Sequence, residues 1–519
     1  MRVFAAIDCG SNSFHLLVVK VDEANQTWEA IARDKEVLRL AEDDSGSRIS
    51  TLAMERGIDV LRRFKERADA LGAERIIAVA TSAIREARNG DAFLERAERE
   101  AGVPINLISG AEEARLIYLG VASSFNFAGR KVAIVDIGGG STELIVGTAT
   151  ELLLNRSVKL GAVHLTAQYH DHDPISADGY QEMLLDIHHG LQPVTAEMRR
   201  IGFDVLVGTS GTIENLAAID AARQGAECKP GYEMSYAHVR EMERSLRGMS
   251  YEERLDVRGM SPRRADIVVA GARVLRTVMD QLDVESVQLC DRALREGVVL
   301  DLLYREGILA DVDHAHDQVR SKSIREVGAR YRCDLVHGER VAKLALAMFD
   351  QLAGLHGVPA AYRDVLEGAA VLHEVGQLVS RDIYHRHTYY LLRHTEFLGF
   401  HDDEIRLMAN LARYHRKSLP KKKHENYMEM SFDHRMVARR LIAILRMARA
   451  LSKSRTGAVD DLTLRVEGNR VIMVLHAAGN VDVELRSAQE KAEVYAKYLG
   501  VDVQLEVNPL GLAAAEVVS

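Results

Sequence analysis

The sequence is poor in cysteine, and its four cysteines follow no pairing pattern. Cys9, Cys228, Cys290 and Cys333 are scattered through 519 residues without a C-x-x-C motif. Disulfide frameworks and zinc knuckles need cysteines at close, regular spacings, so the sequence predicts neither. Scattered thiols are typical of a reducing compartment, and we therefore expect a cytoplasmic protein.

Long apolar runs and an excess of positive charge are also missing. No stretch approaches the roughly 20 apolar residues that a helix needs to cross a bilayer. The chain enters a strand pattern at once, without the charged and apolar regions of a secretory signal. The formal net charge is −9 at pH 7, so the chain as a whole lacks a polyanion-binding field. We expect no membrane and no nucleic acid polymer among its partners.

Residues 131–147 read KVAIVDIGGGSTELIVG and form the most informative stretch of an otherwise ordinary globular sequence. The apolar, β-branched run that ends at Asp136 predicts a buried strand. A second apolar run follows Glu143 and predicts a second strand, so the residues between them form a tight turn. The turn consists of Gly138, Gly139, Gly140 and Ser141.

This turn predicts a phosphate site with metal ligands beside it. Glycines leave the backbone N–H groups of a turn free to face an anion. Asp136 and Glu143 flank the turn, and carboxylates beside a phosphate cradle are the hard oxygen ligands that Mg²⁺ prefers. The alternative is a glycine hairpin that only reverses the chain.

A second copy of the same layout strengthens the phosphate interpretation. Residues 3–20 read VFAAIDCGSNSFHLLVVK: an apolar strand, Asp8, a turn that contains Ser11 and Asn12, and another apolar strand. Two such units indicate an internal duplication. We therefore predict two lobes whose turns face each other across a cleft, with Asp8 as a further acid beside the metal.

Three more segments supply candidate contacts. Arg85 follows a predicted strand, 75–79, at the sheet edge where α/β proteins bind ligands, and it suits either a phosphate fork or a surface ion pair. Glu112 and Glu113 fall in the first turn of a predicted helix, where one of them either stabilises the helix dipole or acts as a general base. A strand–turn–helix motif, GTSGT, offers an anion its N–H groups and hydroxyls at Ser210, Gly211 and Thr212.

The second half reads as helical from about Ser321, after a polar linker at 312–318. His373-Glu374 resembles the His-acid dipeptide of metal-dependent phosphohydrolase bundles of the HD type. Glutamate is longer than aspartate and would displace the carboxylate, so we expect no working metal site, and histidines that bind anions or fill structural positions. The histidines that punctuate this half also include His337, His385, His387, His394 and His415.

A basic run in this half predicts either a solvated loop or a track for a polyphosphate chain. Its members are Arg413, His415, Arg416, Lys417, Lys421, Lys422 and Lys423. The last segment alternates between predicted strands and one helix, which indicates a small α+β domain without recognisable chemistry.

Six motifs in this order resemble the exopolyphosphatase / guanosine pentaphosphate phosphohydrolase (Ppx/GppA) family. They are DCGSNSFHLLVV, ATSAIRE, ISGAEEARLIYLGV, VDIGGGSTELIVG, GTSGT and ALREG. The resemblance covers residues 1–306 strongly and continues more weakly through the helical half. It implies actin-like (ASKHA) duplicated ribonuclease-H-like lobes, 1–124 and 125–306, then an all-α HD-like domain, 315–448, and a small α+β domain, 449–519.

The resemblance also implies an activity. Members remove the terminal phosphate of inorganic polyphosphate, and many hydrolyse the alarmone pppGpp. By motif, Glu113 matches the catalytic glutamate, and Asp136 and Glu143 match carboxylates associated with Mg²⁺. Ser11, Asn12 and Arg85 match phosphate contacts, and relatives are homodimers.

Three other functions are also compatible with the sequence. An actin-like ATPase or kinase would use the same cleft but would need an adenine pocket. An alarmone sensor would bind pppGpp with little or no turnover. A helical HD-type phosphohydrolase would place the main activity in the second half.

Overall fold

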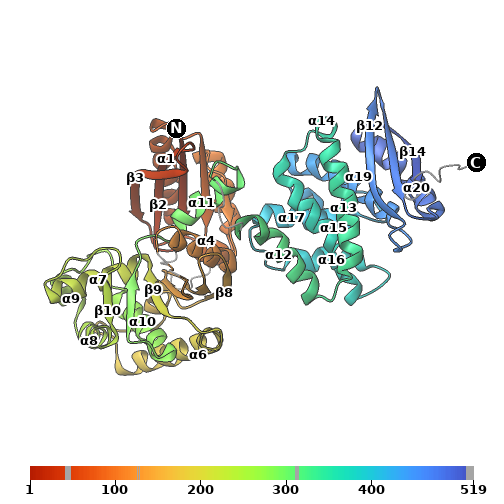
Figure 1. Ribbon diagram of the computed structural model, residues 1–519. Helices are drawn as coiled ribbons and strands as arrows, with labels where there is room; N and C mark the ends of the chain where they lie inside the picture. Colours follow the sequence, from red (N-terminus) through yellow and green to blue (C-terminus); the bar gives the residue numbers. More distant parts are fainter. Residues whose placement is uncertain (41–47, 126, 128, 310–314, 510–519) are drawn as a thin grey trace, which may run out of the picture. The chain divides into compact units, whose positions relative to one another are not determined.

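The computed structural model describes residues 1–40, 48–125, 127, 129–309 and 315–509. Contacts within the chain divide it into two compact units, Met1–Asp317 and Gln318–Ser519. In Figure 1 the first unit runs from red to green and the second from green to blue. Among the described residues, no helix is both long and apolar enough to cross a membrane.

The first unit contains two sheets that repeat one topology. The first has the strand order β3-β2-β1-β4-β5, in which β1–β3 form an antiparallel meander and β4 and β5 run parallel to β1. The second has the order β10-β11-β9-β6-β7-β8. The strands are β1 (Arg2–Cys9), β2 (Ser13–Asp22), β3 (Thr27–Val37), β4 (Arg75–Ala80), β5 (Ile105–Leu107), β6 (Val132–Ile137), β7 (Thr142–Gly147), β8 (Leu152–Val158), β9 (Val205–Thr209), β10 (Glu233–Ser235) and β11 (Ser286–Leu289).

Read from its other edge, β8-β7-β6-β9-β11 repeats the first sheet strand by strand, with the same parallel and antiparallel pairs. This correspondence is what a duplication within the chain produces. The α/β class that the sequence predicts is confirmed.

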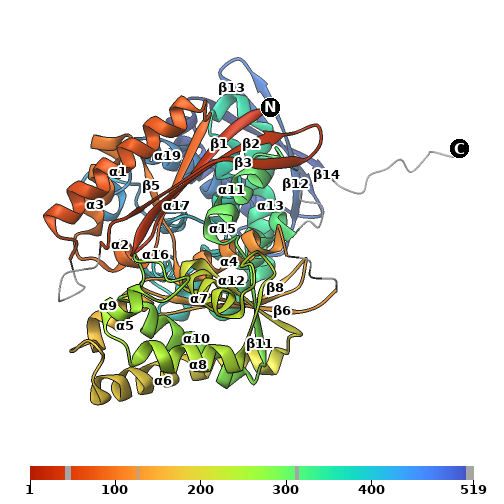
Figure 2. The same ribbon diagram turned by 90° about the vertical axis from the view of Figure 1, so that its left-hand side faces the viewer.

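Helices cover these sheets, and α6, α8 and α10 pack side by side (Figure 2). The helices of the first unit are α1 (Thr51–Ala70), α2 (Ser82–Glu86), α3 (Gly90–Arg96), α4 (Gly110–Ala122), α5 (Ala162–Tyr169), α6 (Ala177–Ile201), α7 (Ser210–Gln224), α8 (Tyr236–Arg247), α9 (Tyr251–Leu255), α10 (Val268–Leu282) and α11 (Leu294–Arg305), with a π-helical turn at Ala97–Ala101.

Strand β1 is apolar from Val3 to Ile7, and its central residues are buried on both faces. Ala5 and Ile7 belong to a core that includes the buried face of α1. Phe4 and Ala6 belong to a different core, which also contains residues of α4, α11 and β6. Helices α4 and α11 therefore share one core with strands of both sheets, and this core fixes the two lobes to each other.

Two glycines allow α4 and α11 to pack closely. A Cβ atom on Gly120 would lie 2.1 Å from the carbonyl oxygen of Ala293, and one on Gly297 would lie 1.8 Å from that of Leu116. Real Cβ atoms do not approach oxygen this closely, so each position requires glycine. The contact matters for the site because α4 carries Glu113 near its first turn.

The second unit combines a helical bundle with a three-stranded sheet in the order β12-β13-β14. One hydrophobic core, which extends from Ile324 to Val501, includes side chains of both parts. The predicted linker at 312–318 lies partly outside the described residues, and α12 begins at Ala315.

The elements of this unit are α12 (Ala315–Arg330), α13 (Leu335–Gln351), α14 (Ala353–His356), α15 (Arg363–Leu372), α16 (Tyr384–Arg393), α17 (Asp402–Tyr414), α18 (Glu425–Met428), α19 (Phe432–Leu451), β12 (Val459–Glu467), β13 (Arg470–Ala477), α20 (Asp482–Leu499) and β14 (Asp502–Pro509), with 3₁₀ turns at Ala360–Tyr362 and Val375–Leu378.

Candidate active site

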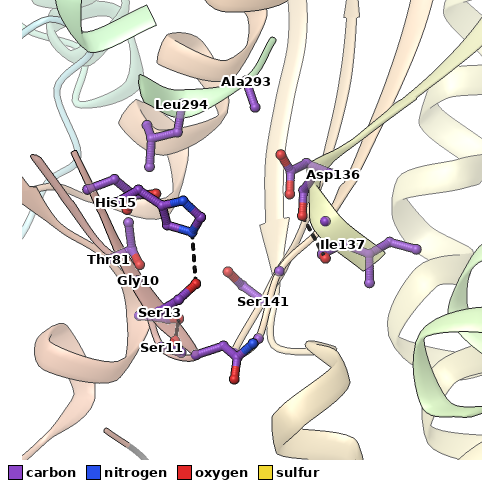
Figure 3. A pocket seen from close by; sticks show the side chains of 18 of the residues that line it. Gly10, Ser11, Ser13, His15, Thr81, Asp136, Ile137, Ser141, Ala293 and Leu294 are labelled. Atoms are coloured by element: carbon purple, nitrogen blue, oxygen red, sulfur yellow. Dashed lines mark hydrogen bonds between the residues drawn. The ribbon is translucent and has the colours of Figure 1, made fainter. Parts of the chain in front are cut away.

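The two predicted turns line one cavity of about 120 Å³ in the first unit. Figure 3 shows Ser11, Ser13 and His15 on one side and Asp136 and Ser141 on the other. Of the predicted site residues, those that line the cavity are Asp8, Ser11, Asn12, Glu113, Asp136, Gly138, Gly139, Gly140, Ser141, Ser210 and Gly211.

The turns approach each other closely because the second one is made of glycine. A Cβ atom on Gly140 would lie 2.4 Å from the hydroxyl oxygen of Ser82, which itself lies 2.9 Å from that of Ser11. Any side chain at Gly140 would therefore push the lobes apart. The backbone of this turn is held beside the cavity, where its N–H groups can approach an anion.

Strand pairing sets the acids beside the turns. In the β6–β7 pair Asp136 lies opposite Glu143, and in the β1–β2 pair Asp8 lies opposite His15. The second hairpin is thus acidic on both strands, whereas the first carries one acid and one histidine. Burial, followed by the charge of Glu143, raises the pKa of Asp136 well above its usual range.

The structure separates the two glutamates that the sequence left equivalent. The carboxylate of Glu112 accepts two hydrogen bonds from Arg115, of 2.8 and 2.7 Å, and is fully buried away from the cavity. Glu113 lines the cavity, and its Oε2 atom is buried without a hydrogen-bond partner among the described residues. Burial, followed by the charge of Glu143, raises the pKa of Glu113 well above its usual range. Of the pair, only Glu113 is placed to meet a substrate.

Three predicted residues lie beside the cavity rather than in its wall. Arg85 donates to the carbonyl oxygen of Ile108 at 2.7 Å, and its Nη1 atom lies 3.6 Å from Glu113 Oε2. Arg85 therefore lies beside Glu113, the candidate general base. Glu143 is buried and accepts a 2.7 Å hydrogen bond from Ser157, and the Thr212 hydroxyl accepts one of 3.2 Å from Arg264.

Ser210 has a strained backbone at the edge of the cavity. Its φ angle is +74°, in the left-handed region that residues other than glycine rarely adopt. Its hydroxyl donates to the carbonyl oxygen of Ile137 at 3.0 Å, which ties the start of α7 to the end of β6. Strain of this kind is commonly retained where backbone groups must face a ligand.

Sequence reasoning missed three cations that line the cavity: Lys35 from β3, Arg264 before α10 and Arg295 in α11. Burial, followed by the charge of Arg264, lowers the pKa of Lys35 to about 8. Arg295 Nη1 lies 3.3 Å from His15 Nδ1. Arg295 falls inside the ALREG motif and could have been noticed there, whereas nothing local distinguishes Lys35 or Arg264.

The predicted basic track lies in the second unit, and its residues differ in how far they are exposed to solvent. His415 is only 2% exposed, and its ring nitrogens contact the Ala412 carbonyl and the Tyr384 hydroxyl, so it occupies a structural position. Arg416 packs its guanidinium over the Tyr384 ring at 4.6 Å, as Arg413 does over Tyr389 at 5.7 Å. The exposed members are Lys417, Lys421, Lys422 and Lys423.

Comparisons with known proteins agree over most of the chain. The model of the Ppx/GppA phosphatase family matches residues 17–306, and that of Ppx/GppA phosphatase, domain III, matches residues 319–488. A Vibrio vulnificus (strain YJ016) protein named guanosine-5'-triphosphate,3'-diphosphate pyrophosphatase is 32% identical over 495 residues, which is 95% of each chain. Its Vibrio campbellii counterpart is 32% identical over 480 residues, 92% of each chain.

Solved structures match about three fifths of the chain. A crystal structure of an exopolyphosphatase from Cytophaga hutchinsonii is 27% identical, with a TM-score of 0.55, and covers 60% of this chain and 100% of that one. The Aquifex aeolicus member of the Ppx/GppA family is 29% identical, with a TM-score of 0.51, and covers 59% and 98%.

Proposed function

The chain belongs to the Ppx/GppA phosphatase family, and from that premise we propose that it hydrolyses the terminal phosphoanhydride bond of pppGpp or of inorganic polyphosphate. We place pppGpp first because the relatives named for it match about 95% of the chain, whereas the exopolyphosphatase structure covers 60%. The two substrates share a linear chain of phosphates with a free end. Homodimer formation and a cytoplasmic location stay predictions.

One observation carries this proposal: a single cavity joins two phosphate-type turns, buried carboxylates and three cations. The backbone N–H groups of the Gly138–Ser141 turn suit the oxygens of a terminal phosphate. Lys35, Arg264 and Arg295 supply the positive charge that successive phosphates need. We infer that the terminal phosphate lies at the glycine turn beside the acids, and that the cations bind the phosphates that follow it.

Glu113 is the proposed general base for the attacking water. It is the cavity carboxylate whose Oε2 has no hydrogen-bond partner among the described residues and whose pKa is raised by burial. A base with a raised pKa accepts a proton from water more readily than an ordinary carboxylate does. The guanidinium of Arg85, 3.6 Å away, favours the ionised carboxylate that this role requires.

The acids around the turns fit a divalent cation such as Mg²⁺, which would be held by Asp136 with Glu143 or Asp8. Asp8 Oδ1 is buried without a hydrogen-bond partner among the described residues, and burial raises the pKa of Asp8 to about 6. The described cleft acids do not converge as three ligand atoms within 4.8 Å, which suits an ion that keeps waters and substrate oxygens in its shell. When bound, such an ion neutralises charge that develops on the phosphate oxygens.

A substrate panel tests the proposal. Purified full-length protein is given pppGpp, long-chain polyphosphate, tripolyphosphate and ATP, with and without Mg²⁺, and released orthophosphate is measured. We expect fast release from pppGpp or long polyphosphate that requires Mg²⁺, and slow release from ATP. Preferential ATP hydrolysis would instead identify an actin-like ATPase, and tight pppGpp binding without release would identify a sensor.

A further inference from the structure

A second pocket, of about 290 Å³, lies in the helical part of the second unit. Four cationic side chains and one carboxylate dominate its lining, which consists of His337, Glu374, Gln377, Tyr384, Arg416, Arg449, Ser452, Lys453 and Arg455. None of these residues belongs to the cavity of the first unit. The pocket therefore needs an account of its own.

Beside this pocket His337, His373 and Glu374 each present one ligand atom, and these atoms all lie within 4.8 Å of one another. They form the one such group among the residues that the structure describes. His337 lies in the first turn of α13, and His373 follows the end of α15, which packs against α13. The packing of two helices thus brings the group together.

The sequence predicts that the longer side chain of Glu374 displaces its carboxylate from His373, and the structure shows the carboxylate beside it. Glu374 Oε1 lies 3.7 Å from His373 Nε2, so the additional methylene does not separate the two groups. Arg455 binds the other oxygen, Oε2, and also lies 3.2 Å from Asp334. Oε1 faces His373, accepts a long hydrogen bond of 3.3 Å from the Tyr384 hydroxyl and lies 3.9 Å from Arg449, while Arg455 holds Oε2.

The ring of His373 presents a nitrogen lone pair that no described residue occupies. Its Nδ1 atom lies 2.7 Å from the Ala370 carbonyl, to which it can only donate, so the lone pair belongs to Nε2. That Nε2 atom is buried, has no hydrogen-bond partner among the described residues, and points toward Glu374. Histidine ligands of metals typically donate their other nitrogen to a carbonyl in this way.

The surrounding charge decides which metal fits. Arg416, Arg449, Lys453 and Arg455 outnumber Glu374, so a hard ion held by charge alone, such as Mg²⁺, is repelled. Imidazole ligands favour borderline ions such as Zn²⁺ or Co²⁺. Three protein ligands leave coordination positions open, and an anion there would also neutralise the cations around it.

We propose that His337, His373 and Glu374 form a second metal site, which binds a divalent transition-metal ion together with a phosphate group held by Arg449 and Lys453. The proposal does not rest on the function proposed for the first unit, because no residue is shared. Metal and phosphate bind this pocket cooperatively, each improving the affinity for the other by the same factor.

Cobalt titration of the metal-free, full-length protein tests the site. In wild-type protein, one equivalent of Co²⁺ should show the visible absorption of an imidazole-ligated ion, which the carboxylate site of the first unit does not give, and inorganic phosphate should tighten binding of this equivalent about fivefold or more. Glu374→Gln and His337→Gln should each weaken binding at least about tenfold. His394→Gln, an exposed histidine of the same unit, and Glu113→Gln, in the first unit, should bind Co²⁺ like wild type.

A separate substitution tests whether phosphate binds at this site. Lys453→Ala, at an exposed position, should leave Co²⁺ binding unchanged in buffer without phosphate and reduce the phosphate enhancement. Equal Co²⁺ affinity in Glu374→Gln, loss of the cobalt spectrum in Glu113→Gln, or phosphate that weakens binding would each overturn the proposal. Should a ligand variant fail to fold by circular dichroism, X-ray absorption of cobalt-loaded wild type decides: fewer than two imidazole ligands contradicts the site.

Discussion

Gly297→Ala should disturb catalysis from a distance, because Gly297 sits where α11 crosses α4. Its Cβ atom would lie 1.8 Å from the Leu116 carbonyl oxygen, whereas ordinary contacts begin at 3.4 Å. The two helices must therefore separate by about 1.6 Å. Forced separation in a packed core typically costs about 1–3 kcal/mol of unfolding free energy. Since α4 carries Glu113, displacement of its carboxylate by about 1 Å would lower kcat by about 10²-fold.

Urea unfolding and steady-state phosphate release measure the two effects separately. Gly248→Ala is the matched control in the same unit, because its Cβ atom would meet only a carbonyl oxygen at 3.7 Å, and its φ angle of −83° suits alanine. We expect the control to keep wild-type stability and turnover. A Gly297→Ala protein with both properties unchanged would refute the view that α4 is fixed by α11.

Three further predictions concern charge. Burial raises the pKa of Asp8 from 3.8 to about 6. The stability that its protonated form contributes is therefore complete below pH 3.8 and is lost as pH rises through 6. Without divalent cations, urea unfolding should show this loss in wild type and less of it in Asp8→Asn. Lys35 has its pKa lowered by burial to about 8, so KM should rise above pH 8, whereas Lys35→Met should have a high KM with little pH dependence in steady-state assays. Replacement of the exposed Lys421–Lys423 by alanine should weaken binding of long polyphosphate more than that of tripolyphosphate in competition assays, and an equal loss for both would exclude a track.

The sequence predicted the parts of the site that depend on local pattern. Glycine turns after apolar strands, such as the one that follows Asp136, are visible because strand, turn and acid are contiguous. The duplication also predicted that the turns of Ser11 and Gly139 share a cavity, because equivalent edges of two duplicated sheets can face each other.

The remainder depends on contacts between distant segments. Glu112 and Glu113 occupy the same helical turn, and only the packing of Arg115 against Glu112 shows which acid is free to meet a substrate. Lys35 and Arg264 reach the cavity from different lobes, and no sequence motif near either residue indicates this position. The position of Glu374 beside His373 likewise depends on Arg455, which lies 81 residues further along the chain.

The central claim is that Glu113 deprotonates water at a phosphate bound between the two turns. Single-turnover phosphate release by Glu113→Gln, together with equilibrium binding of the same substrate, tests it most directly, and Glu98→Gln, at an exposed position of the same lobe, is the control. We predict unchanged substrate affinity and a rate about 10²–10⁴-fold below that of wild type. A Glu113→Gln protein that releases phosphate at the rate of the control would contradict the account.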